Sequence, residues 1–266
     1  MPQPPRERLD AIRFARSAPD RFRRGDRVLL HVHSGRPGGP TFLLVHGIGV
    51  GCRYFARVIP LLEDLGTVLT VELPGFDRAP KPRQVLAVEN HADLLADFVA
   101  EQGDRVVAAG HSMGAQIVAD LAARHPGTVT AAALLGPVTD PRERTAWQQG
   151  LRLAQDTMLE PPGANRVVFT DYARTGPARY LRTLPSMLHY DLEAALPKIA
   201  VPSLVLRGTR DPICRHDFAA RLVGLLPAGR LGEVPGAPHV AMWRRPDRVA
   251  AELQALALAG AQARAR

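Results

Sequence analysis

Residues 106–114 read Val-Val-Ala-Ala-Gly-His-Ser-Met-Gly, and this stretch decides the fold. The first four residues are apolar, which is typical of a strand buried on both faces of a parallel sheet. Residues 115–125 follow with apolar side chains on one face of a helix. The sequence therefore predicts a strand, a sharp turn at residues 110–114 and then a helix.

The turn carries the pattern Gly-x-Ser-x-Gly, which suits a nucleophilic serine. On such a turn the hydroxyl of Ser112 stands above the carboxyl end of the strand, and its neighbours two residues away must be small because strand and helix lie close together. Gly110 and Gly114 meet that requirement. The amide of Met113 and the start of the helix would face a developing oxyanion.

A second apolar run, residues 41–45, predicts another buried strand and ends in His46-Gly47-Ile48-Gly49. Glycines let this loop turn sharply and approach a substrate closely. We expect the Ile48 amide to pair with the Met113 amide as the oxyanion hole. His46 precedes the serine at a strand end, and we interpret it as a structural residue of the loop.

The remaining members of a serine hydrolase follow later in the chain. Asp211 comes just after a predicted strand at residues 201–207, where a carboxylate that orients a base belongs. His239 follows a short predicted strand at residues 230–235, and it comes after both Ser112 and that carboxylate. Asp140 also follows a strand and is the alternative acid. The order Ser, Asp, His is the order expected of an α/β-hydrolase.

On these residues the chain resembles the α/β-hydrolase superfamily over roughly residues 20 to 260, in its serine-nucleophile, esterase-like branch with a cap. The resemblance implies an α/β fold, a mostly parallel sheet with helices on both faces, and Ser112, Asp211 and His239 as the catalytic triad. Glu72 stands where aspartate is commoner in the family and Asp77 where glycine is common. The matching segments are His46-Gly47-Ile48-Gly49, Glu72-Leu73-Pro74-Gly75-Phe76, Gly110-His111-Ser112-Met113-Gly114, Gly208-Thr209-Arg210-Asp211 and Pro238-His239.

The interval between residues 140 and 199 is much longer than the dozen or so residues that a parallel crossover needs. We expect residues 1–19 to be an N-terminal extension, residues 20–139 and 200–266 to form the core, and residues 140–199 to form a helical cap over the strand ends, where ligands bind. Its bulky side chains are candidates for substrate contact: Trp147, Met158, Tyr172, Tyr180 and Met187.

The composition fits one α/β domain with an insertion, since the chain has 266 residues of which 46% are hydrophobic. The net charge is +8, but 32 of the 34 basic residues are scattered arginines and no nucleic-acid-binding motif accompanies them. We expect no nucleic-acid partner and no membrane span. Two cysteines without a metal motif, Cys52 and Cys214, and an N-terminus without an apolar signal region favour the cytoplasm.

These features predict a serine hydrolase that cleaves a small ester with an apolar or aromatic acyl group, without a metal or other cofactor. A C–C bond hydrolase, a lactonase or a thioesterase would use the same triad. A ligand-binding protein without catalytic activity could also keep the fold, because a fold alone does not establish activity. The sequence leaves the oligomeric state open.

Overall fold

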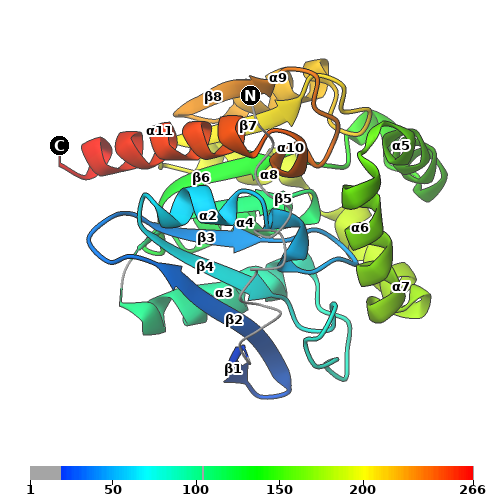
Figure 1. Ribbon diagram of the computed structural model, residues 1–266, viewed down its shortest axis with the longest axis horizontal. Helices are drawn as coiled ribbons and strands as arrows, with labels where there is room; N and C mark the ends of the chain where they lie inside the picture. Colours follow the sequence, from blue (N-terminus) through cyan, green and yellow to red (C-terminus); the bar gives the residue numbers. More distant parts are fainter. Residues whose placement is uncertain (1–18, 104, 266) are drawn as a thin grey trace.

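The computed structural model describes residues 19–103 and 105–265, so most of the expected N-terminal extension lies outside the described residues. An eight-stranded sheet runs through the molecule in the order β1-β2-β4-β3-β5-β6-β7-β8 (Figure 1). β1 and β2 form an antiparallel hairpin, β2 is antiparallel to β4, and the other neighbours are parallel. The strands are β1 (Asp20–Arg24), β2 (Arg27–Gly35), β3 (Thr41–Val45), β4 (Thr67–Glu72), β5 (Val106–His111), β6 (Val129–Leu135), β7 (Ser203–Gly208) and β8 (Gly229–Val234). The predicted α/β class and mostly parallel sheet are confirmed.

Helices cover both faces of the sheet because successive side chains of a strand point to opposite faces. In β3, Leu43 and Val45 pack with the helices of one face, and Phe42 and Leu44 pack with those of the other. The first face carries α3 (Val88–Gln102), α4 (Met113–Arg124), α8 (Leu192–Ala195) and α9 (His216–Leu225). The second carries α2 (Ile59–Glu63), α10 (Ala241–Arg244) and α11 (Pro246–Arg264).

Residues 54–65 do not form one continuous helix. The segment contains a short 3₁₀ turn, η2 (Cys52–Phe55), and then the separate helix α2. Pro60 lies in the first turn of α2, where its missing N–H costs nothing, and it cannot continue a helix from the preceding residues. The break leaves Tyr54 and Phe55 buried against the sheet.

Between β6 and β7 the chain forms three longer helices, which we call the inserted helices: α5 (Ala146–Leu159), α6 (Pro162–Thr175) and α7 (Pro177–His189). Proline begins α6 and α7, so each junction ends one helix and starts the next. Figure 1 shows the three helices together beyond the carboxyl end of β3, where the loops that follow the parallel strands lie. No helix in the described part of the chain is long and apolar enough to cross a membrane.

Candidate active site

Ser112 lies on the predicted turn between β5 and α4, with backbone angles φ 58° and ψ −120°. A positive φ is rare for a residue with a side chain and marks local strain. The surrounding backbone holds it: the Ser112 amide donates to the carbonyl of Leu135 at 3.0 Å, and the Ser112 carbonyl accepts from Ala115 at 2.9 Å. Ser112 lines an apolar cavity of about 340 Å³.

Gly110 and Gly114 are required because neighbouring backbone atoms leave no room for a side chain at either position. A Cβ at Gly114 would lie 2.7 Å from the carbonyl oxygen of His46, and one at Gly110 would lie 2.8 Å from the amide of Ala115. The loop after β3 also reaches the serine, since a Cβ at Gly47 would be 3.0 Å from the Cβ of Ser112 and 3.4 Å from its Oγ. The structure therefore brings the loop that contains Ile48 next to Ser112.

His239 and Asp211 are hydrogen-bonded to each other. Nδ1 of His239 lies 2.8 Å from Oδ2 of Asp211, and both side chains are buried. The other carboxylate oxygen of Asp211 accepts from the amides of Ile213 at 2.8 Å and Cys214 at 3.0 Å, which fixes its orientation. Burial lowers the pKa of His239, but the charge and hydrogen bond of Asp211 outweigh burial, and the pKa lies above the usual 6.5.

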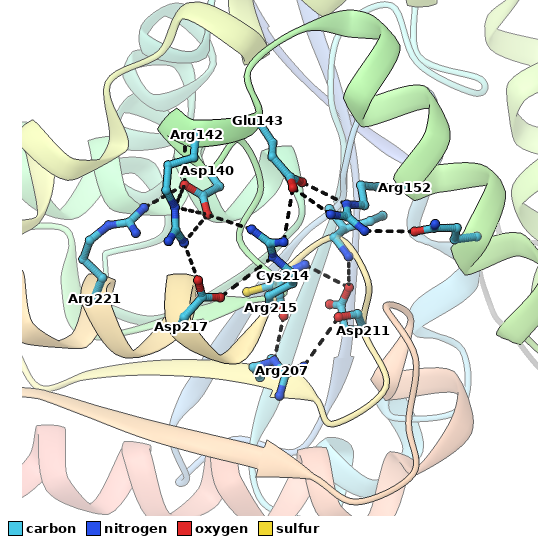
Figure 2. Close-up of polar contacts among 12 residues, drawn as sticks. Asp140, Arg142, Glu143, Arg152, Arg207, Asp211, Cys214, Arg215, Asp217 and Arg221 are labelled. Carbon is cyan, nitrogen blue, oxygen red and sulfur yellow. Dashed lines mark hydrogen bonds and ion pairs between the residues drawn. The ribbon is translucent and has the colours of Figure 1, made fainter.

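Asp140, the alternative acid, is engaged elsewhere. Figure 2 shows its carboxylate among the guanidinium groups of Arg142, Arg215 and Arg221. Nη2 of Arg142 donates at 2.7 Å and Nη2 of Arg221 at 2.8 Å. Burial alone would raise the pKa of Asp140, but these arginines hold it well below its usual range. Asp211, and not Asp140, is the carboxylate bonded to His239.

A buried chain of hydrogen bonds connects three loops of the site, and the sequence analysis missed it. The amide of Gly47 donates to the hydroxyl of Tyr54 at 2.9 Å, and that hydroxyl lies 3.0 Å from Nδ1 of His111. Nε2 of His111 lies 3.1 Å from the carbonyl oxygen of His239, so Nε2 carries the proton and Nδ1 accepts from Tyr54. The loops that hold Gly47, Ser112 and His239 are thereby fixed to one another.

His46 has the structural role that its position predicts. Its Nε2 accepts from the amide of Leu73 at 3.0 Å, which leaves Nδ1 to donate to the carbonyl of Gly47 at 2.8 Å. Burial lowers the pKa of His46 to about 4, although the bond to Gly47 opposes this. The imidazole is therefore neutral at physiological pH and ties the loop after β3 to the end of β4.

A cavity of about 340 Å³ separates Ser112 and His239 from the inserted helices. Of the predicted substrate contacts, Tyr172, Tyr180 and Met187 line it, and the two tyrosine rings meet edge to face with centroids 5.3 Å apart. Both rings contact the loop after β3, since a Cβ at Gly49 would lie 2.7 Å from Tyr180 and 2.8 Å from Tyr172. Ile48 also lines the cavity, whereas Met113 is buried as the first residue of α4.

Trp147 and Met158 do not line this cavity, and the prediction for them is corrected. Each is 79% exposed on the outer side of α5. The side of α5 that faces the cavity carries Ala146, Leu153 and Thr157 instead. Residues 147 and 158 are eleven positions apart, which places them on one stripe of the helix, turned away from the cavity-lining stripe.

Two buried carboxyl groups of the cavity wall were also missed. Asp156, in the last turn of α5, accepts from the amide of His239 at 2.9 Å, and Glu160 accepts from the amide of Val240 at 2.6 Å. Burial raises the pKa of Asp156 and raises that of Glu160 to about 8. Their spacing of four residues, one helical turn, was the only signal in the sequence.

The two cysteines are buried and unpaired. The thiol of Cys52 donates to the carbonyl of Val71 at 2.6 Å, and the amide of Cys214 binds Asp211. Burial raises the pKa of both thiols well above the usual value, so neither is a reactive thiolate. Within the described ranges, no cluster of three or more His, Cys, Asp or Glu side chains is arranged to hold a metal ion.

Two relatives match this chain over most of its length. The biotin biosynthesis bifunctional protein BioHC of Cellvibrio japonicus is 27% identical over 239 residues, which cover 81% of this chain and 47% of that protein, so the chain spans about half its length. The pimeloyl-[acyl-carrier protein] methyl ester esterase of Aromatoleum aromaticum is 27% identical over 241 residues, which cover 78% of this chain and 94% of the esterase.

Solved structures show the same fold. A membrane phospholipase A superposes with a TM-score of 0.78 at 25% identity, covering 93% of this chain and 89% of the other. An esterase from Thermogutta terrifontis superposes with a TM-score of 0.76 at 20% identity, covering 90% of this chain and 97% of the other. Residues 42–252 match the model of the alpha/beta hydrolase family. The chain therefore belongs to the alpha/beta hydrolase family.

Proposed function

We propose that the protein is a serine hydrolase that cleaves a small, uncharged carboxylic ester through an acyl-enzyme intermediate. The observation that carries this proposal is the 2.8 Å bond between His239 and Asp211, in the wall of the cavity that Ser112 also lines. Ser112 supplies the nucleophile, His239 the base, and Asp211 the group that orients the base. The strained φ of 58° at Ser112 supports the assignment, because such strain is typical of nucleophile turns.

The reaction would follow the usual course of acyl transfer. His239 accepts the hydroxyl proton as Ser112 attacks the acyl carbon, and the amides of Ile48 and Met113 stabilise the oxyanion. The imidazolium of His239 then protonates the leaving alcohol. A water molecule, deprotonated by His239, attacks the acyl-enzyme and releases the acid, which restores the serine hydroxyl.

The cavity favours an uncharged acyl group of modest size. Its volume of about 340 Å³ lies near the lower end of the range of roughly 300–1,000 Å³ for small-molecule sites. Aromatic and aliphatic side chains form most of the wall, and the described lining residues include no lysine or arginine. The carboxyl group of Asp156 lies in the same wall, so an anionic acyl group would meet like charge there, with no cation among the described lining residues to pair with.

We further propose that residues 140–199 form a cap domain over a core of residues 20–139 and 200–266. The cavity supports this division, because one side of it consists of the inserted helices and the other of loops after β3, β5, β6, β7 and β8. Two buried, unpaired cysteines suit a reducing compartment, and we propose the cytoplasm as the place of action.

Ester cleavage is supported by the relative from Aromatoleum aromaticum, whose name describes it as a methyl ester esterase. The bond type is tested with p-nitrophenyl esters from acetate to palmitate, a thioester, a lactone and a ring-fission diketone. We expect the highest kcat/KM with short or medium acyl chains, and loss of turnover in Ser112→Ala. If only the diketone, only the lactone or only the thioester is turned over, the protein cleaves that kind of bond and not an ester.

The charge preference is tested with methyl heptanoate and monomethyl adipate, which have similar acyl lengths but differ by one carboxylate. We expect the uncharged ester to be hydrolysed with a kcat/KM at least about tenfold higher, because like charge in a desolvated site costs one or more kcal/mol. Equal values would show that the charge of Asp156 does not face the acyl group.

A further inference from the structure

Two neighbouring amides of the loop after β8 bind two carboxyl groups from the end of α5. The amide of His239 donates to Oδ1 of Asp156 at 2.9 Å, and the amide of Val240 donates to Oε1 of Glu160 at 2.6 Å. Asp156 and Glu160 are one helical turn apart, so both project from the same side of the helix end. The inserted segment is thus bonded directly to the loop that holds the candidate base.

These carboxyl groups are costly to bury. Asp156 is 3% exposed and Glu160 is 7% exposed, and Oε2 of Glu160 has no hydrogen-bond partner among the described residues. A buried carboxyl group that lacks a cationic partner destabilises a fold, whereas asparagine and glutamine could accept the same amide hydrogens without a charge. Acidic groups kept at such a cost are expected where they serve function rather than packing.

His239 is held from three directions. Asp211 binds its Nδ1 from the loop after β7, His111 binds its carbonyl oxygen from the end of β5, and Asp156 binds its amide from α5. Only the last of these contacts comes from the inserted helices. Burial lowers the pKa of His239, but the charges of Asp211 and Asp156 raise it, and Glu160 adds to this effect once it ionises.

We propose that Asp156 and Glu160 are positioning residues of the His239 loop, so that the end of α5 completes the catalytic site. The proposal rests on the proposed function, because it assumes that His239 acts as the base. The two carboxyl groups act through His239: they fix the backbone from which the imidazole projects, and they favour its protonated form. Leu153 and Thr157 lie on the cavity side of the same helix, so a substrate that contacts them also contacts the helix whose end is bonded to the His239 loop.

The variants separate the hydrogen bond from the charge. Asp156→Asn keeps an oxygen that accepts from the His239 amide but removes the charge, and Asp156→Ala removes both. We expect Asp156→Ala to lower kcat by about tenfold to a hundredfold, because a shift of about 1 Å in a catalytic group costs that much. We expect Asp156→Asn to retain most of kcat but to move the acid limb of kcat/KM to lower pH. At the Val240 amide, Glu160→Gln likewise removes only the charge, and Glu160→Ala removes both the charge and the hydrogen bond.

Asp171→Asn is the control, since Asp171 is a fully buried acid of α6 that also binds a backbone amide, that of Gly51 at 3.0 Å, although it is paired with Arg53 as well. Asp171 does not contact the His239 loop, so the acid limb of kcat/KM should stay in place in Asp171→Asn. The pKa of His239 is measured separately by NMR titration of the imidazole, with His239→Gln to assign the signal. We expect Asp156→Asn to lower this pKa and Asp171→Asn to leave it unchanged.

The outcomes distinguish the two proposals. If the wild type hydrolyses esters but all four variants keep its kcat and its pH profile, the positioning role is wrong while the proposed function stands. If the wild type hydrolyses no ester, the proposed function fails, and the NMR titration still decides whether Asp156 and Glu160 set the state of His239. Loss of thermal stability in the alanine variants with unchanged kcat and unchanged His239 pKa would mark a merely structural contact and overturn the proposal.

Discussion

The backbone of Gly136 lies directly against the imidazole of His239. A Cβ at position 136 would be 3.0 Å from both Nδ1 and Cε1 of His239 and 3.3 Å from Oδ2 of Asp211, and Gly136 has φ +50°. The end of β6 therefore forms the surface on which the His239–Asp211 pair rests. Only glycine provides both the positive φ and the space.

Gly136→Ala should displace this pair and lower kcat by about tenfold to a hundredfold. Gly25→Ala is its control, because Gly25 also has a positive φ, +61°, but nothing lies within 4 Å of a Cβ there. Both variants should lose roughly 1–2 kcal/mol of unfolding free energy from the left-handed backbone. Steady-state kinetics and urea unfolding of the two proteins check this, and equal kcat values would contradict it.

Asp211→Asn should retain the fold and lower kcat by about 10³ to 10⁴, because an amide stabilises the wrong tautomer of the histidine. Asp140→Asn should change kcat little, because Asp140 is bonded to Arg142 and Arg221 and not to His239. Kinetics of both variants, with circular dichroism to confirm folding, test the assignment. The reverse ranking would make Asp140 the orienting acid.

The pH dependence of activity should reflect the raised pKa of His239. Burial lowers this pKa, but Asp211 outweighs burial and raises it above 6.5. The base must be neutral, so kcat/KM should fall as pH drops through this pKa, with a midpoint above the range of roughly 6 to 7 that an unperturbed histidine gives. A pH profile of kcat/KM from pH 5 to 10 measures the midpoint. A midpoint below 6.5 would contradict the electrostatic account of the site.

Glu72 should make stability fall with rising pH. It is fully buried beside Asp77, with Nη2 of Arg78 4.0 Å away, and burial raises its pKa from 4.5 to about 8. The folded protein binds this proton more tightly than the unfolded chain, so the stabilisation is complete below pH 4.5 and is lost as pH rises through 8. Glu72→Gln should therefore be more stable than the wild type at pH 9, by roughly 1–3 kcal/mol, with little difference near pH 4.5.

Urea unfolding at pH 5, 7 and 9 checks this prediction. Glu89→Gln serves as the control because Glu89 is exposed in the first turn of α3 and should show no gain that grows with pH. A Glu72→Gln protein that is less stable than the wild type at pH 9 would show that the charged form of Glu72 is stabilised by its surroundings.

The strands and the chemistry-bearing loops could be predicted from the sequence because their signals are local. The apolar run before Ser112 and the glycines beside it report a buried strand and a tight turn within nine residues. Asp211 and His239 were predicted as site residues in the same way, each by its place just after a strand. The family match and the sheet order confirm the fold that these patterns predicted.

The rest depends on which segments meet in space. A series of hydrogen bonds runs from Gly47 through Tyr54 and His111 to His239 and joins three loops. Nothing in the sequence near Tyr54 indicates these partners. The inserted helices show a second limit. Apolar spacing in α5 identifies a stripe that contains Trp147 and Met158, but it does not say whether that stripe faces the cavity or the outside. Bulk alone was therefore a poor guide to which side chains line the cavity.

The central claim is that Ser112 is a nucleophile activated by His239, and covalent labelling tests it most directly. The protein is treated with a fluorophosphonate, and the adduct is located by mass spectrometry of its peptides. The account predicts rapid, stoichiometric labelling at Ser112, absent in Ser112→Ala and greatly slowed in His239→Gln. A folded wild-type protein that takes up no label, or that is labelled at another residue, would contradict it.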